Sequence, residues 1–137
     1  MKKSQIITAA ALLIMTACGT NNATQKKIDI TGEWNIVEVN GNAVPETPEA
    51  PTINFNEETH TFFGSTGVNE LSGSYILKND TLVFLEGAIT EMAADSISMA
   101  FESDYLHTIG HVRTVSSGNG SLSLKDDNGS TIILLKK

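Results

Sequence analysis

Short runs of alternating apolar and polar residues, interrupted by turn residues, constrain the fold of this chain more than any other feature. A period of two places successive side chains on opposite faces of a strand, and Asn-Gly pairs favour the tight turns of hairpins. We therefore expect mostly β structure from Gly32 onward. The expected strands cover residues 34–39, 52–55, 59–64, 72–77, 81–85, 112–115, 121–124 and 131–135.

One segment has the periodicity of a helix instead. Between Ala93 and Leu106, apolar residues recur at steps of three and four, which places them on one face of a helix. We expect Asp95 or Ser96 to cap the start of this helix and Gly110 to end it. The expected buried stripe consists of Ala93, Ile97, Ala100, Phe101 and Tyr105.

The order of these elements predicts a mainly β fold with one inserted helix. About eight short strands suit an antiparallel barrel or half-barrel, with the helix covering its open mouth or one face. Glu102 and Asp104 would then face water. The residues expected to be buried together are Trp34, Phe55, Phe84, Ile97 and Phe101.

The N-terminal segment has the pattern of a bacterial lipoprotein signal. Two lysines precede an apolar stretch, Ile6–Met15, which is too short to cross a membrane as a helix. Small residues then lead into Cys18. The pattern predicts that residues 1–17 are removed by cleavage between Ala17 and Cys18, and that the Cys18 thiol carries the lipid. An ordinary secretory signal with an unrelated cysteine is the alternative.

Composition narrows the chemistry open to the mature chain. Removing residues 1–17 leaves 120 residues (137 − 17), which is one domain, and the polar residues 18–30 are expected to form a flexible tether. The leader holds 2 of the 9 basic residues, so the mature net charge is 7 − 16 = −9, which argues against nucleic acid as a partner. Cys18 is the only cysteine, so its lipidation leaves no thiol for a disulfide, metal site or catalysis. Membrane attachment is expected through the acyl anchor alone.

Two motifs in the middle of the chain are recognisable. The first is GSTGVNELSGSY from Gly64 to Tyr75, and the second is AITEMAA at residues 88–94. Together with the earlier Gly-Glu-Trp, they resemble the META domain family, which includes the HslJ-like heat-shock lipoproteins of Gram-negative envelopes. The resemblance runs from residue 31 to 135 and identifies residues 31–137 as the META domain. The corresponding motif residues are Gly67, Asn69, Gly73, Tyr75, Thr90, Met92, Ala93 and Glu102.

The resemblance implies a lipocalin-like barrel or half-barrel, structural roles for the motif residues and no catalytic activity. Two motif positions that are cysteines in the family are Val68 and Ala94 in this chain. We expect these two side chains to touch, so that an apolar contact takes the place of a disulfide. The Asn69 side-chain amide is expected to hydrogen-bond local backbone groups that no strand partner satisfies.

Other residue patterns match active-site chemistry less well. The glycine-rich stretch Gly64–Gly73 lacks the Gly-Lys-[Ser/Thr] of a phosphate-binding loop. His107 and His111 stand four residues apart, as in a zinc helix, but Gly110 lies between them; we expect His107 near the helix C-terminus and His111 at the start of a strand. Ser, His and Asp occur without the G-x-S-x-G motif of a hydrolase. No metal, cofactor or catalytic residue is expected.

The expected function is that of a non-enzymatic, lipid-anchored envelope protein, a binding or stress-protective accessory that faces the periplasm from the outer membrane. Two alternatives stay open: a lipocalin-like carrier of a small apolar ligand within its barrel, and a hydrolase. The tripeptides centred on Thr81 and Ser96 also resemble the Asp-[Ser/Thr]-aliphatic site of an envelope O-glycosylation system. The sequence names neither a ligand nor a protein partner.

Overall fold

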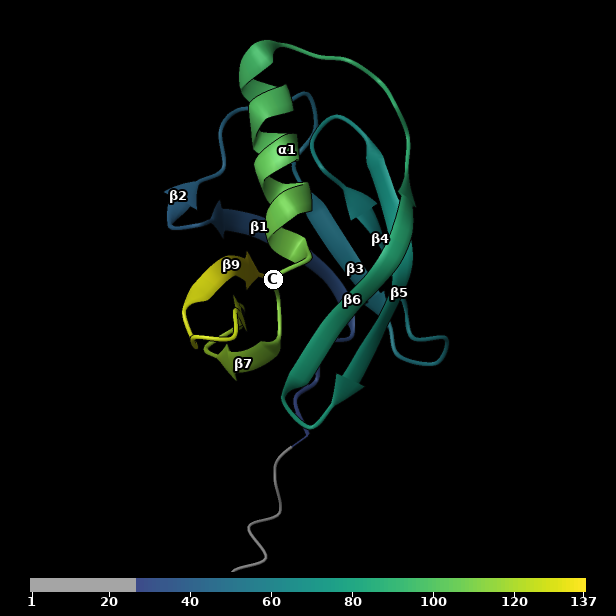
Figure 1. Cartoon of the computed structure of the whole chain (residues 1–137), viewed down its shortest axis with the longest axis vertical. Helices are drawn as coiled ribbons and strands as arrows, with labels where there is room; N and C mark the ends of the chain where they lie inside the picture. The colour runs from purple at the N-terminus through teal and green to yellow at the C-terminus, as the bar shows by residue number, and fades with distance from the viewer. Residues whose placement is uncertain (1–26) are drawn as a thin grey trace, which may run out of the picture.

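The computed structural model describes residues 27–137, which form one antiparallel sheet and one helix (Figure 1). The predicted mainly β fold is confirmed, all the predicted strands are present, and the short strand β2 is added to them. The helix α1 (Ser96–Ile109) follows the sixth strand. The strands are β1 (Gly32–Val39), β2 (Asn42–Ala43), β3 (Thr52–Asn56), β4 (Thr61–Ser65), β5 (Glu70–Lys78), β6 (Thr81–Ile89), β7 (Thr114–Gly118), β8 (Ser121–Lys125) and β9 (Thr131–Lys136).

The sheet closes on itself like a ring. Its strand order is β2-β1-β3-β4-β5-β6-β7-β8-β9, and β1 also pairs with β9, where Asn35 lies opposite Lys136. The narrowest junction lies between β6 and β7, where Thr81 opposite Thr114 is the single residue pair that joins the two strands in the described chain. The helix α1 packs against β1 and β9 (Figure 1).

Two tight hairpin turns follow the predicted turn chemistry. Asn40 and Gly41, between β1 and β2, have φ angles of 50° and 77°. Asn119 and Gly120, between β7 and β8, have φ angles of 47° and 73°. Positive φ at both central residues matches the twist of the flanking strands, and asparagine and glycine tolerate it better than other residues. These four residues therefore set the register of their hairpins.

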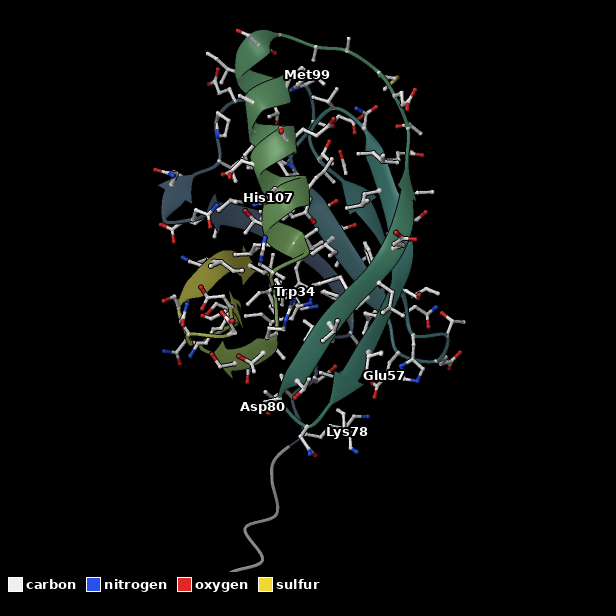
Figure 2. The ribbon with its side chains drawn as sticks, in the orientation of Figure 1. Trp34, Glu57, Lys78, Asp80, Met99 and His107 are labelled. Atoms are coloured by element: carbon white, nitrogen blue, oxygen red, sulfur yellow. The ribbon has the colours of Figure 1, made fainter. Side chains whose placement is uncertain are left out.

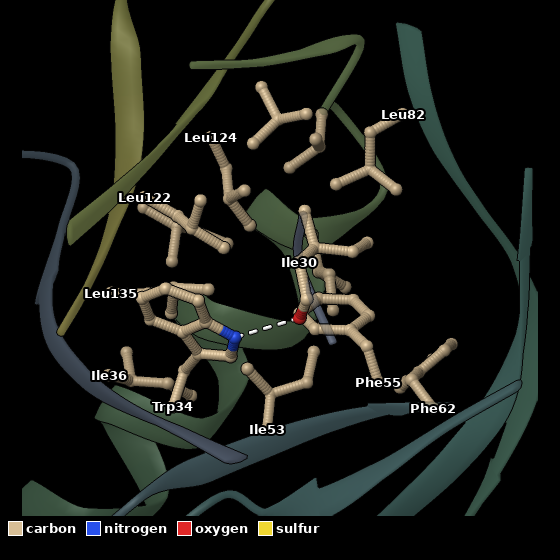
Figure 3. Close-up of a cluster of buried hydrophobic side chains, with 14 of the residues drawn as sticks. Ile30, Trp34, Ile36, Ile53, Phe55, Phe62, Leu82, Leu122, Leu124 and Leu135 are labelled. Carbon is tan, nitrogen blue, oxygen red and sulfur yellow. Dashed lines mark hydrogen bonds between the residues drawn. The ribbon is translucent and has the colours of Figure 1, made fainter. Parts of the chain in front are cut away.

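The interior of the ring is filled by apolar side chains (Figure 3). Trp34, Phe55 and Phe101 are buried there, as predicted. The Trp34 Nε1 donates a hydrogen bond to the Ile30 backbone oxygen at 2.8 Å. Because Ile30 is itself 1% exposed, the folded core begins before residue 31, and the tether expected over residues 18–30 reaches too far toward the C-terminus.

Phe84 joins this core only in part. Its ring lies 5.0 Å from that of Phe62 and 6.0 Å from that of Phe55, measured between centroids, but the residue is half-buried. On the side of β7, the pairing of β6 in the described chain ends with Thr81 and with the hydrogen bond from the Leu82 N–H to the Arg113 oxygen, which leaves the rest of the strand more open.

The helix turns a different face to the core from the predicted one. Ile97 is 65% exposed, so its predicted burial is wrong, and the predicted exposure of Glu102 is wrong as well. Four residues advance an α-helix by about 40° more than one full turn. Ile97 lies eight residues before Tyr105, so its side chain is rotated by about 80° from that of Tyr105 and lies outside the buried face. Asp104 is exposed, as predicted. The buried residues of α1 are Ser98, Phe101, Glu102, Tyr105, Thr108 and Ile109.

Asp95 caps α1, as predicted, and the helix ends at Gly110. The Asp95 Oδ1 accepts from the Ser98 N–H at 2.9 Å, and its Oδ2 accepts from the Ser98 hydroxyl at 2.7 Å. These hydrogen bonds hold the pKa of Asp95 below its usual range. The cap therefore stabilises α1 above the ordinary pKa of aspartate, and this contribution is lost as the pH falls through the lowered value.

Gly64 lies where β3 and β4 approach each other closely. A Cβ atom at this position would lie 2.0 Å from the Thr52 backbone oxygen. We expect Gly64→Ala to lower the free energy of unfolding by roughly 1–3 kcal/mol, because one strand must shift to relieve the overlap. Urea denaturation measures this loss, and Gly118→Ala is the control, since a Cβ there meets nothing within 4 Å. Equal stability of the two variants would contradict the close approach.

The predicted signal and anchor lie outside the described residues, which start at Lys27. This applies to residues 1–17, to Ala17 and Cys18 at the predicted cleavage site, and to most of the expected tether. In the part of the chain that the structure describes, no helix combines the length and the hydropathy needed to cross a membrane.

Candidate functional site

Three segments meet in a buried polar cluster around Asn69. This residue lies between β4 and β5 and is 2% exposed. Its Oδ1 accepts from the Met92 backbone N–H at 2.6 Å and from the Thr90 hydroxyl at 2.9 Å. Its Nδ2 donates to the Met92 backbone oxygen at 3.0 Å and to the Glu102 carboxylate at 2.9 Å. The Asn69 side chain bonds backbone groups, as predicted, but they belong to Met92, 23 residues away, instead of to the local backbone.

Glu102 closes this cluster from the helix side. Its side chain is 7% exposed and accepts hydrogen bonds from the Thr66 hydroxyl and the Asn69 amide. The Thr66 hydroxyl accepts in turn from the Asn69 backbone N–H at 2.9 Å. Within residues 27–137, no buried side-chain nitrogen or oxygen lacks a hydrogen-bond partner. We call Thr66, Asn69, Thr90, Met92 and Glu102 the Asn69 clasp, because together they tie the β4–β5 loop to α1 and to the segment that precedes it.

The remaining motif residues are constrained by close packing or by their backbone contacts. Gly67 has a φ of 97°, and a Cβ there would lie 2.7 Å from a threonine side chain. A Cβ at Gly73 would meet an aromatic ring at 2.9 Å. Tyr75 lies edge to face with Phe55 at 5.3 Å between centroids, and burial raises the pKa of the Tyr75 hydroxyl. The Met92 side chain is 61% exposed, so the backbone of Met92 carries its contact with the clasp.

Val68 and Ala94 flank the clasp and are both half-buried. Val68 precedes Asn69, and Ala94 follows two residues after Met92, so the clasp hydrogen bonds hold their two segments together. Direct contact between the two side chains stays a prediction.

A groove of about 420 Å³ crosses the outer face of the sheet. One row of side chains runs along it from β1 to β6, and each member lies opposite the next one on the neighbouring strand. On β1, β3 and β4 the members of this row alternate with core residues, so they point away from the interior, and the strand pairing places the members on β5 and β6 on the same face. The row consists of Glu33, Asn54, Phe63, Ser72 and Ala88.

A second row borders the same groove. Thr52, Ser65 and Glu70 lie opposite one another on β3, β4 and β5. The Ser65 hydroxyl donates to the Glu49 carboxylate at 3.4 Å, which directs Glu49 from its loop toward the groove. Between the rows, the lining is completed by Gly64, Leu71 and Ile89.

Three carboxylates and one aromatic ring set the character of the groove. Glu33, Glu49 and Glu70 are exposed, and Phe63 is 55% exposed. Among the described residues that line the groove there is no lysine, arginine or histidine. The groove therefore combines a negative electrostatic potential with an apolar contact surface.

His107 and His111 come together at another surface. Their ring centroids lie 4.8 Å apart, and both line a pocket of about 400 Å³ with Asp126 and Asp127. His107 lies in the last turn of α1, as predicted (Figure 2), whereas His111 precedes β7 instead of starting a strand. The chain turns after Gly110 and enters β7 only at Thr114, which explains the difference. Over residues 27–137, no three His, Cys, Asp or Glu side chains are placed to hold a metal ion.

Sequence reasoning identified most of the clasp but missed the groove. Thr66, which donates a hydrogen bond to Glu102, could not be identified from the sequence, because threonine is common in polar loops. The doublet of Phe62 and Phe63 did offer a signal for the groove. Adjacent residues of a strand face opposite sides, so one of two neighbouring aromatic rings has to point outward. Which residues surround that ring depends on the register of five strands.

Comparisons with known families and structures agree with this fold. A family model described as META domain matches residues 26–137. A protein from Burkholderia xenovorans, solved by NMR, is 23% identical with a TM-score of 0.61, and the match covers 99% of this chain and 97% of that one. A crystal structure of a DUF4847 family protein from Bacteroides vulgatus is 15% identical with a TM-score of 0.56, covering 77% and 92%. At these identities the two structures show a shared fold. No curated protein matches the chain.

Proposed function

Because the chain belongs to the META domain family, we propose that it is a non-enzymatic, lipid-anchored accessory protein of the bacterial cell envelope. It acts by binding a ligand on the outer face of its sheet, in the groove around Phe63. The signal-like leader and Cys18 support the anchor. The Asn69 clasp supports the non-enzymatic part, because the buried carboxylate of Glu102 is fully engaged in holding the fold together.

The position of the groove is the observation that carries this proposal. The interior of the ring is occupied by core side chains, among them Phe55, Leu82 and Leu122, each at most 1% exposed. The groove lies on the opposite face of the same strands, and its volume of about 420 Å³ suits a small ligand or a short segment of a larger one. A carrier that encloses an apolar ligand inside the ring would have to displace these core side chains. Binding at the outer face needs no such rearrangement.

Photo-crosslinking tests the groove directly. The photoreactive residue p-benzoylphenylalanine at position 63 should form an adduct in intact envelopes. The same residue at position 76 is the control, because Ile76 is 51% exposed on β5, comparable with Phe63, and does not line the groove. An adduct at position 63 and none at position 76 is the expected result. Equal yields at the two positions, or no adduct at position 63, would count against binding in the groove.

Lipidation is tested through the cysteine. Cys18→Ala should abolish incorporation of labelled palmitate and accumulate as an uncleaved precursor, because no thiol remains to accept the lipid. Its domain should unfold at the same temperature as that of the parent protein, because the lipid is expected on a tether outside the folded domain. Thr16→Ala, which keeps a small residue before the cleavage site, is the control. If Cys18→Ala is still processed and remains on the membrane after a carbonate wash, the anchor assignment is wrong.

A further inference from the structure

We infer that the groove around Phe63 takes an organic cation, that is, an amine or similar group joined to an aromatic or aliphatic body. This inference rests on the proposed function, because it names the class of ligand for the same groove. It follows from three properties of the lining residues: an accessible ring, carboxylates on both sides of that ring, and a spacing of these carboxylates that suits a group larger than a metal ion.

Phe63 provides the accessible ring. Its cross-strand neighbours on β3 and β5 are Asn54 and Ser72, which are smaller polar residues. At 55% exposure the Phe63 ring therefore offers surface to a ligand without a bulky neighbour at either side. An aromatic face binds flat apolar groups by stacking and attracts cations through its quadrupole.

The carboxylates surround this ring from different elements. Glu33 lies in the same row as Phe63, two strands away, whereas Glu70 lies in the second row on β5. Glu49 comes from the loop before β3, and its own backbone N–H donates to the Gly67 oxygen at 3.1 Å, which fixes the loop beside the groove. The one salt bridge in the described chain joins Lys27 to Glu57, so none of these three carboxylates is paired there.

The arrangement favours an organic cation over the other charged ligands. A phosphate or carboxylate ligand would meet three negative charges and no basic side chain in the lining. A bare metal ion would need ligands gathered at one point, and no group of three candidate ligands exists within residues 27–137. A cationic group on an apolar body can instead contact the Phe63 ring while its charge lies near the glutamates.

Two indole compounds of opposite charge provide the test. Tryptamine is a cation and indole-3-propionate an anion at neutral pH, and they share the same ring system. Titration calorimetry with the purified full-length chain in non-ionic detergent should show tryptamine binding at least about tenfold tighter at low salt, and the preference should shrink as salt rises.

Variants assign the contacts. Phe63→Ala and the double variant Glu33→Gln/Glu70→Gln should each weaken tryptamine binding by about fivefold, the scale of a stacking contact or of two exposed charge pairs. Ile76→Ala and Glu86→Gln are the controls, because both residues are exposed on neighbouring strands and neither lines the groove. The controls should bind tryptamine like the parent protein.

The outcomes separate this inference from the proposed function. Equal affinity for the two compounds, no binding of tryptamine, or unchanged binding by the Glu33→Gln/Glu70→Gln double variant would overturn the cation assignment. The crosslinking result at position 63 does not depend on the charge of the ligand, so groove binding would stand or fall by that result alone. If no adduct forms at position 63 but tryptamine binds tightly, the groove binds organic cations without having a ligand in the envelope. That result would overturn the proposed function and leave the cation assignment standing.

Discussion

Replacing Phe101 by alanine should lower the free energy of unfolding by about 3–5 kcal/mol, the usual cost of deleting a buried aromatic ring. Phe101 is 8% exposed and stacks on Tyr105, with ring centroids 6.2 Å apart and an interplanar angle of 5°. Tyr105 is 1% exposed, and its burial raises the pKa of its hydroxyl well above the usual range. Removing the Phe101 ring leaves a cavity between the helix and the core, which the fixed strands cannot close.

Ile97→Ala on the same helix is the matched control. It removes a similar apolar side chain, but Ile97 is 65% exposed, so the loss should stay within about 0.5 kcal/mol. Chemical denaturation of both variants, monitored by tryptophan fluorescence, measures the difference. Comparable losses for the two variants would mean that α1 does not pack on the core through the face that carries Phe101 and Tyr105.

The second large effect is expected at Asn69. Asn69→Ala should cost about 3 kcal/mol, because it removes hydrogen bonds to Thr90, Met92 and Glu102 and leaves the buried Glu102 carboxylate with fewer donors. Asn54→Ala provides the comparison, since Asn54 lies on the outer face, and this change should cost less than about 0.5 kcal/mol.

A double-mutant cycle shows whether the loss belongs to the clasp. Glu102→Ala removes the charge that Asn69→Ala leaves poorly satisfied, so the double variant should be more stable than the sum of the two single losses predicts. A coupling energy of about 1 kcal/mol or more is expected for residues in one hydrogen-bonded network. Strict additivity would show that Asn69 and Glu102 stabilise the fold independently, against the geometry of the clasp.

The strands of this protein could be predicted because the alternation of apolar and polar residues, and the turn residues that separate the strands, lie within each short segment. The turns at Asn40-Gly41 and Asn119-Gly120 need positive φ, and residues that tolerate it mark them in the sequence. The helix was recognisable for the same reason, and Asp95 marked its start. The boundary at Ile30 was missed because a lone isoleucine in a polar segment gives no periodic signal, although its burial and its bond to Trp34 place it in the core.

The rotation of the helix and the groove depend on information that no single segment contains. Glu102 looks like a surface residue until the amide of Asn69 and the hydroxyl of Thr66, more than thirty residues earlier, supply its hydrogen bonds. The family motif named Asn69 and Glu102 without stating that they meet. Phe63 could be placed outward, but its neighbours follow only from the pairing of β1, β3, β4, β5 and β6.

The pairing of β1 with β9 also has a consequence for how the protein is made. Asn35 near the start of the domain lies opposite Lys136 at its end, so the ring is closed by contacts between residues that are far apart in sequence. Such non-local contacts slow folding, because a long loop has to be ordered before the pairing stabilises it. A nascent chain that still lacks β9 cannot complete its core. Under the proposed export, slow folding would favour an unfolded polypeptide that can pass through a translocation channel before it folds on the far side.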